Sequence, residues 1–143
     1  VDVLLLNDGE ARQLFETPSL VKAAAAALKL GPRFIIIKKG EHGALLFGDG
    51  SHFSAPGYPL ENIKDPTGCG DSFAGALIGY LTNKGSNSSS DNGKTEKDLR
   101  KAIVYGSVVA SFNAEAFSLE RLKRLTASEI EKRYKEFERI REF

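Results

Sequence analysis

Two short apolar runs separated by an alanine-rich segment constrain the fold of this chain more than any other feature. Val1–Leu6 and Phe34–Ile37 are nearly continuous in apolar residues, which is typical of strands buried on both faces of a sheet. Between them lies Ala23–Ala27, and alanine has the highest intrinsic helix propensity. Because strands that alternate with helices favour parallel pairing, this order predicts an α/β fold with a mainly parallel central sheet.

The rest of the sequence predicts a hairpin followed by helices. Two strand-like runs flank Gly48-Asp49-Gly50, a pattern typical of an antiparallel hairpin. Apolar residues at helical spacing predict three further helices and one at the end of the chain. The expected strands are Ala44–Phe47 and His52–Ala55, and the expected helices are Ser72–Leu81, Leu99–Phe112, Leu119–Leu125 and the segment from Ser128 onward.

Serines and glycines in these helices lead to local predictions. Ser118 and Ser128 are expected N-caps, and Ser128 is followed three residues later by Glu131, as in a capping box. Gly75 and Gly79 lie one turn apart in the first of these helices. A glycine in a helix interior costs roughly 1 kcal/mol relative to alanine, so close packing around both glycines is expected.

The length of 143 residues fits a single domain, residues 1–143, with one core. The polar segment 83–97 predicts a flexible surface loop between two helices. The chain has no Met and opens directly on a strand-like run. We therefore expect the C-terminal part of a longer protein, and the alternative is a chain trimmed at a natural boundary.

Composition excludes several classes of protein. The longest apolar runs are far shorter than the roughly 20 residues of a membrane-spanning helix, so no membrane association is expected. The net charge is +1, which does not indicate a nucleic-acid surface. Cys69 is the one cysteine and cannot form an internal disulfide. With no signal peptide at the start, these features predict a cytoplasmic protein.

The strongest chemical signal is Gly68-Cys69-Gly70-Asp71, which lies where a loop meets the helix expected at Ser72–Leu81. A helix N-terminus leaves backbone N–H groups unpaired and carries a partial positive charge, so glycines there let a phosphate approach closely. Asp71 could then accept a proton from a substrate hydroxyl that attacks the phosphate. A tight turn in which Asp71 only caps the helix is the alternative that these residues leave open.

The segment Asp65–Gly75 resembles the C-terminal signature of ribokinase-like (PfkB-type) carbohydrate and nucleoside kinases, whose pattern is close to Asp-Thr-x-Gly-Ala-Gly-Asp-x-Phe-x-Gly. Two further motifs occur in the family's order: Asn7-x-x-Glu10 after the first strand and Lys38-Lys39-Gly40-x-x-Gly43 after the second. The resemblance implies a three-layer αβα sandwich, of which this chain is the C-terminal half only. It also implies ATP-dependent phosphoryl transfer to a hydroxyl of a sugar or nucleoside.

The resemblance assigns the chemistry of transfer to the glycine-rich segment. Asp71 would be the catalytic base that activates the hydroxyl. The backbone N–H groups of Gly68, Cys69 and Gly70 would form an anion hole over the transferred phosphate. Phosphoryl transfer depends mainly on positioning and on stabilising charge, and these groups could supply both.

The same resemblance assigns the nucleotide to the first part of the chain. Asn7 and Glu10 would position magnesium–ATP, with Glu10 binding Mg²⁺ through water, since Mg²⁺ keeps several of its waters. The Lys38–Gly43 loop would hold the nucleotide. Lys38 or Lys39 would reach a phosphate, and the alternative for either lysine is a solvated surface side chain.

Departures from the family pattern bear on a monovalent cation. Asp65 and Thr67 match positions that bind such an ion, for example K⁺, in some members. The distal part of that site is expected after a later helix, where this chain has Asn113–Ala116 in place of a glycine-alanine pair. Pro66 and Cys69 stand where many members have Thr and Ala, and Cys69 is interpreted as a small-residue replacement rather than a nucleophile.

Family members are roughly twice as long, and their N-terminal half supplies most contacts to the acceptor. The leading hypothesis is therefore the C-terminal part of a sugar or nucleoside kinase. One alternative is a non-catalytic nucleotide- or phosphate-binding fragment, or a module of a split protein, lacking the acceptor-binding half. A domain that kept the fold and lost activity is a third. We expect association with the missing N-terminal half or as a homo-oligomer, because a partial sheet leaves an open edge.

Overall fold

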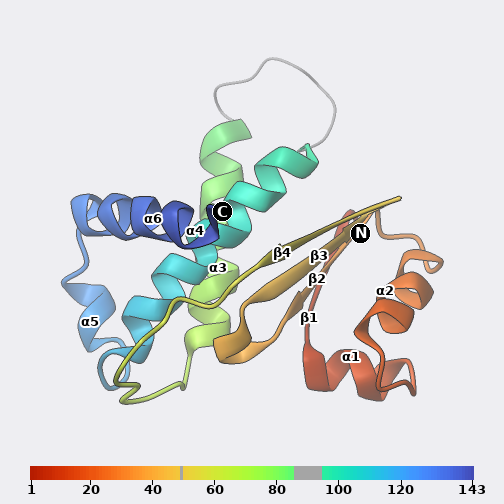
Figure 1. Cartoon of the computed structure of the whole chain (residues 1–143), viewed down its shortest axis with the longest axis horizontal. Coiled ribbons are helices and arrows are strands. Elements are labelled where there is room, and N and C mark those ends of the chain that lie inside the picture. The colour runs from red at the N-terminus through yellow and green to blue at the C-terminus, as the bar shows by residue number, and fades with distance from the viewer. Residues whose placement is uncertain (49, 86–94) are drawn as a thin grey trace. The chain divides into compact units, whose positions relative to one another are not determined.

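The computed structural model describes residues 1–48, 50–85 and 95–143 of the chain (Figure 1). The described residues form two compact units, Val1–Gly57 and Tyr58–Phe143, and each is described on its own. Residue 49, in the expected hairpin turn, and residues 86–94, in the expected flexible loop, lie outside the described residues. The expectation of a single domain stays a prediction.

The first unit is built on a four-stranded sheet in the order β1-β2-β3-β4. β1 and β2 pair in parallel, while β2 with β3 and β3 with β4 pair antiparallel. The α/β class is confirmed, but these four strands form a mixed sheet rather than the mainly parallel one expected. The reason is that short connections join only antiparallel neighbours, whereas a parallel pair needs a long crossover. The strands are β1 (Val3–Asn7), β2 (Phe34–Lys38), β3 (Ala44–Gly48) and β4 (Ser51–Ala55).

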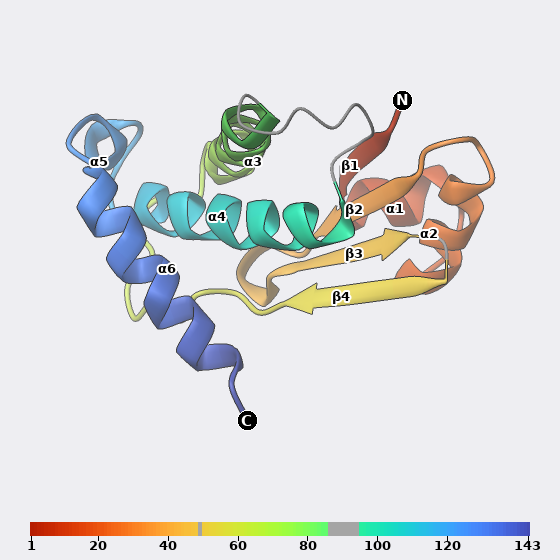
Figure 2. The same cartoon turned by 90° about the horizontal axis from the view of Figure 1, so that it is seen from above.

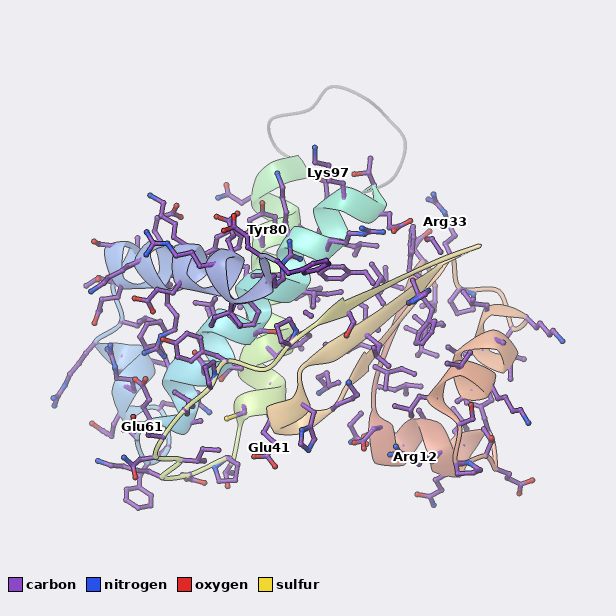
Figure 3. The ribbon with its side chains drawn as sticks, in the orientation of Figure 1. Arg12, Arg33, Glu41, Glu61, Tyr80 and Lys97 are labelled. Carbon is purple, nitrogen blue, oxygen red and sulfur yellow. The ribbon has the colours of Figure 1, made fainter. Side chains whose placement is uncertain are left out.

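Two helices, α1 (Asp8–Leu14) and α2 (Leu20–Leu28), form the crossover between β1 and β2 and lie on the same side of the sheet (Figure 1). Their buried residues are alanines, which leave room for the helices to approach the strands closely. Arg12 pairs with Asp8 at 2.6 Å on the outer surface of α1 (Figure 3). The core of this layer consists of Ala11, Ala23, Ala24, Ala27, Ile35 and Ile37.

The second unit is helical in its described residues. α3 packs along α4, and α6 packs on α4 (Figure 2). The apolar stripe expected on α3 is confirmed, because Phe73, Leu77 and Leu81 are all buried. Within the described ranges, no helix combines the length and apolar character needed to cross a membrane. The helices are α3 (Cys69–Gly85), α4 (Glu96–Ala114), α5 (Glu120–Lys123) and α6 (Ala127–Arg141).

The expected close packing at Gly75 and Gly79 is wrong. A Cβ added at either glycine would meet no atom of the described residues within 4 Å outside the helix backbone. Gly106 on α4 is instead the glycine at the helix contact, since a Cβ there would lie 2.9 Å from the carbonyl oxygen of Phe73. Spacing within one helix does not reveal which of its faces meets a neighbour.

The starts of α4, α5 and α6 differ from the sequence predictions. α4 begins at Glu96, inside the segment expected to be a loop, because Thr95 and Asp98 form a capping box. α6 is capped by Thr126 with Glu129, not by Ser128, so the same serine/threonine-x-x-glutamate pattern operates two residues earlier. Ser118 is not a cap, because its φ of 53° is left-handed while an N-cap needs extended backbone.

Candidate active site

Asn7 and Glu10 lie where β1 ends and α1 begins. Asn7 Oδ1 accepts a hydrogen bond from the Glu10 N–H at 2.7 Å, and Glu10 Oε2 accepts one from the Asn7 N–H at 2.8 Å. This reciprocal pair is a capping box, which satisfies two backbone donors at the start of the helix. The Asn-x-x-Glu pattern therefore has a role in the fold that is independent of any ligand.

The position of Glu10 also fits a role toward Mg²⁺. Its side chain is exposed, and the capping box uses Oε2, which leaves Oε1 for a further partner. Mg²⁺ is commonly held by one or two carboxylates together with waters and phosphate oxygens. Among the described residues, no group of three or more His, Cys, Asp or Glu side chains is placed to hold a metal ion. An ion here would depend on this carboxylate, water and the oxygens of a ligand.

Lys38 is the last residue of β2 and lies opposite Asn7 in the parallel register. The carboxyl ends of parallel strands meet at one edge of a sheet, and ligands of open α/β sheets commonly bind outside that edge. Lys38 and Lys39 are both half-buried. The structure thus brings the Asn7–Glu10 motif and the start of the lysine loop together at one edge of the first unit.

The loop that follows β2 is closed by its own backbone. The Lys39 N–H donates to the Gly43 carbonyl at 2.7 Å, and the His42 N–H donates to the Lys39 carbonyl at 3.1 Å. These bonds surround a 3₁₀ turn, η1 (Gly40–His42). Much of the backbone of this loop is therefore committed to holding the loop itself.

Packing explains two glycines at this loop. Gly43 has a φ of 89°, and a Cβ there would lie 2.0 Å from the carbonyl oxygen of Ala55. Gly57 packs against the same loop, since a Cβ added there would lie 1.8 Å from the carbonyl oxygen of Glu41 (labelled in Figure 3). Any side chain at either position would displace backbone.

The glycine-rich segment of the second unit begins with a tight turn. The Cys69 N–H donates to the Pro66 carbonyl at 3.2 Å, which closes the four residues Pro66 to Cys69. Gly68, the third residue of the turn, has a φ of 80°. A type II turn requires a positive φ at its third residue, and glycine supplies it without strain.

The turn leads directly into α3, which begins three residues earlier than expected. Gly68 to Asp71 therefore form the junction and first turn of this 17-residue helix. In the hydrogen bonds of the described residues, the N–H groups of Gly68, Gly70 and Asp71 have no acceptor, whereas that of Cys69 is used within the turn. The Asp71 side chain is exposed beside these donors. The segment can offer three amide donors and a carboxylate to a ligand.

Asp65 organises the residues before the turn. Its Oδ1 accepts a hydrogen bond from the Thr67 N–H at 2.9 Å, and its Oδ2 accepts one from the Ser118 N–H at 3.5 Å. Hydrogen bonds from the side chain and the backbone of Thr67 lower the pKa of Asp65, and that from the Ser118 backbone lowers it further. Asp65 thus stays charged at neutral pH and connects the turn to the segment after α4.

Sequence reasoning missed the contact that Asn113 makes with this turn. Asn113 lies near the end of α4, is 1 % exposed, and donates through Nδ2 to the Thr67 carbonyl at 3.0 Å. Nδ2 also lies 3.6 Å from Cys69 Sγ. An amide between the apolar residues Phe112 and Ala114, directly after the helix predicted to end at Phe112, is the signal that could have drawn attention to it.

The predicted site residues therefore fall into two sets. The first unit holds Asn7, Glu10 and the Lys38–Gly43 loop, and the second holds Asp65, Thr67 and the Gly68–Asp71 junction. Each set is assembled by local structure: a helix cap and a strand end in the first, a turn and a helix start in the second.

Relatives of known activity are similar to parts of this chain. A cytidine kinase from Thermococcus kodakarensis is 37 % identical over 83 residues, which cover 56 % of this chain and 30 % of that kinase. An aminoimidazole riboside kinase from Salmonella enterica, solved with aminoimidazole riboside and an ATP analogue, superposes with a TM-score of 0.77 at 23 % identity. That similarity covers 94 % of this chain and 42 % of the kinase.

A fructokinase double mutant from Vibrio cholerae, solved with fructose, ADP and a potassium ion, superposes with a TM-score of 0.71 at 19 % identity. That similarity covers 82 % of this chain and 36 % of the fructokinase. The chain therefore spans less than half of the cytidine kinase, the riboside kinase and the fructokinase. The structural matches confirm the ribokinase-like fold. The family model of the pfkB carbohydrate kinases matches residues 1–121. The chain belongs to the pfkB family of carbohydrate kinases.

Proposed function

We propose that the chain carries the nucleotide-binding part of an ATP-dependent kinase, with Asp71 as the base, that phosphorylates a hydroxyl of a sugar or nucleoside. The observation that carries the proposal is the Gly68–Asp71 junction, where three amide donors that have no acceptor among the described residues lie beside an exposed carboxylate. Membership of a kinase family supports this interpretation. The names of the relatives include a nucleoside kinase and a sugar kinase, so the proposed acceptor is a sugar or a nucleoside.

In the proposed reaction, Asp71 accepts the proton of the acceptor hydroxyl as its oxygen attacks the terminal phosphorus of ATP. The bond between that phosphorus and the bridging oxygen breaks, and ADP leaves with the electron pair. Amide donors of Gly68 and Gly70, together with that of Asp71, stabilise charge on the transferring group at the positive end of α3. The Cys69 N–H contributes less than the family pattern implies, because it already donates to Pro66.

The edge of the first unit would hold the triphosphate. Asn7 and Glu10 would position the nucleotide with its metal, and Lys38, Lys39 and the Gly40–Gly43 turn would bind its phosphates. Mg²⁺, when bound, neutralises phosphate charge during transfer. The shared edge of Asn7 and Lys38, together with the free oxygen of Glu10, supports this assignment.

Asp65 and Thr67 are proposed to hold a monovalent cation such as K⁺ next to the anion hole. Their adjacency in the turn supports the proposal, because Asp65 supplies a carboxylate and Thr67 an oxygen next to the Gly68–Asp71 junction. The fructokinase solved with potassium shows that a relative in fold binds this ion. Thr67 lies inside the turn that precedes the anion hole, so a cation there would stabilise the turn.

The acceptor-binding residues are proposed to lie in the portion of the relatives that this chain does not span. β1 has a strand partner on one side only in the described sheet, so its other edge suits a further strand. Association with such a portion, or with a second copy, predicts a native mass above that of one chain. A monomeric mass by light scattering would contradict it.

Cys69 provides a direct test, because it is the only cysteine of the chain and lies within the proposed anion hole. ATP with Mg²⁺ should slow its alkylation by iodoacetamide at least fivefold, measured by intact mass. Asp71→Asn should keep this protection and lower phosphoryl transfer by 10²–10⁴-fold, the usual contribution of a general base. Transfer is measured as ADP release with a panel of sugars and nucleosides, on this chain in complex with the proposed acceptor-binding portion. Unprotected Cys69, or full transfer by the variant, would contradict the proposal.

A further inference from the structure

The Thr67–Gly68 peptide is the central peptide of the turn that leads into the proposed anion hole. A peptide unit is planar and trans, so the Thr67 carbonyl and the Gly68 N–H point in opposite directions from the same rigid plane. Type I and type II turns differ in the orientation of this central peptide. Because glycine tolerates either conformation, Gly68 alone does not select between them. A flip would exchange one amide donor for a carbonyl oxygen.

Asn113 contacts this peptide from the buried side. Its Nδ2 donates to the Thr67 carbonyl at 3.0 Å, although the two residues are 46 positions apart. The same nitrogen would lie 3.4 Å from a Cβ at Gly68 and is 3.6 Å from Cys69 Sγ. One amide group therefore contacts the residues on both sides of Gly68, and its hydrogen bond holds the Thr67 carbonyl in the orientation that keeps the Gly68 N–H on the opposite side.

The oxygen of the Asn113 side-chain amide indicates that this residue does not serve to stabilise the folded state. Asn113 is 1 % exposed, and its Oδ1 has no hydrogen-bond partner among the described residues. A buried acceptor without a partner disfavours the folded state, and an apolar side chain of similar size would avoid that penalty. Ser111 on the same helix is different, since its hydroxyl donates to the Val108 carbonyl and accepts from Arg133.

We propose that Asn113 is a positioning residue, whose side-chain amide locks the turn before α3 in the type II form and so presents the Gly68 N–H to the transferred phosphate. The inference rests on the proposed function. It adds a residue that never touches the nucleotide and acts only through the Thr67–Gly68 peptide.

The test compares wild type with Asn113→Leu, Asn113→Ser and the control Ser111→Ala. Leucine removes both amide atoms at similar size, and serine is too short to reach the Thr67 carbonyl. Binding of ATP with Mg²⁺ is followed by NMR at the Gly68, Gly70 and Asp71 amides. We expect at least fivefold weaker binding for both Asn113 variants and a change within twofold for Ser111→Ala.

Peptide orientation is read separately. The NOE between Thr67 Hα and the Gly68 N–H is strong in a type II turn and weakens when the peptide flips. We expect the weak NOE in the Asn113 variants and the strong one in Ser111→Ala. A purely structural role would lower the melting temperature without changing this signal.

Each outcome decides between the two proposals. Absence of binding by wild type overturns the proposed function and this inference together. Binding by wild type, with a folded Asn113 variant that binds within twofold and keeps the strong NOE, overturns the inference alone. If neither variant folds, the Asn113 side-chain amide resonances of wild type decide, because they should shift when ATP and Mg²⁺ are added. Unshifted resonances overturn the inference.

Discussion

The chain contains two loops that each carry two glycines, Lys38–Gly43 in the first unit and Asp65–Asp71 in the second. In the first loop the backbone is used by the loop itself, and Gly43 is required because a side chain would collide with the Ala55 carbonyl. In the second, the Thr67 carbonyl accepts a hydrogen bond from the Asn113 side-chain amide, and three N–H groups have no acceptor among the described residues.

The difference shows that a glycine motif has two physical origins. One glycine is present because neighbouring backbone leaves no room for a Cβ, and its loss affects the fold. The other is present because a turn needs a positive φ next to N–H groups that can bind a ligand. Its loss should weaken the binding of that ligand. The predictions below separate these two effects, because unfolding measures stability and titration of Gly68→Ala measures nucleotide binding.

The largest loss of stability is expected for Gly43→Ala. The new Cβ would lie 2.0 Å from the Ala55 carbonyl oxygen. The native backbone would also hold the alanine at a φ of 89°. The free energy of unfolding should fall by more than about 4 kcal/mol, as for severe overpacking. Urea unfolding followed by circular dichroism measures it. Gly40→Ala is the control: its φ is 56° but its surroundings are open, so a loss of about 1–2 kcal/mol is expected. Equal losses would refute the packing argument.

Gly68→Ala should lower stability less and binding more. Its φ of 80° costs alanine about 1–2 kcal/mol, while the nearest atom, Asn113 Nδ2, is at 3.4 Å. Binding of ATP with Mg²⁺ should weaken about tenfold, because the turn that presents the Gly68 N–H is disfavoured (tenfold is about 1.4 kcal/mol). Calorimetric titration of the folded variant measures the affinity. Unchanged affinity would remove the distinction between the two loops.

Gly79→Ala sharpens the comparison with a glycine that neither packing nor a turn requires. It lies inside α3, and a Cβ there meets nothing within 4 Å outside the helix backbone. Replacing glycine by alanine in a helix interior should therefore raise the free energy of unfolding by about 0.5–1 kcal/mol. Thermal unfolding of the variant beside wild type measures it, with Gly75→Ala as a second open position. A destabilised variant would indicate that this face of α3 is covered in solution.

The smallest effect is expected from an ion pair in the unit that holds the second loop. A hydrogen bond from Arg121, and then bonds from the backbone and side chain of Thr126, lower the pKa of Glu129 from its ordinary value of 4.5 to about 2. A carboxylate with a depressed pKa in the folded state stabilises it above the ordinary pKa and loses that contribution as pH falls toward the lowered value. The stabilisation should be complete above pH 5 and fade between pH 4.5 and 2.

Unfolding of wild type and Glu129→Gln in urea, at several pH values from 7 to 3, tests this window. The difference in stability between them should shrink as the pH is lowered. Glu131→Gln on the exposed face of the same helix is the matched control, and its difference from wild type should vary less with pH. A constant difference for Glu129→Gln would contradict the lowered pKa.

Local patterns predicted the elements of this fold well. The two apolar runs became the parallel pair β1 and β2, and the residues around Gly48-Asp49-Gly50 became the strands of a hairpin. Helix starts were predicted less well, because several serines and threonines compete as caps and the hydrogen-bond geometry decides among them. Thr126 rather than Ser128, and Thr95 within an expected loop, show this.

Sequence by itself determined the class of the fold, the family and the residue types of both predicted sites, because apolar periodicity and short motifs are local properties of the chain. The tertiary structure alone decided which glycines are packed and that Asn113 donates a hydrogen bond to the Thr67 carbonyl in the turn before α3. The physical reason is range. Hydrogen bonds and steric contacts between residues far apart in sequence depend on how helices pack, and no local pattern records that.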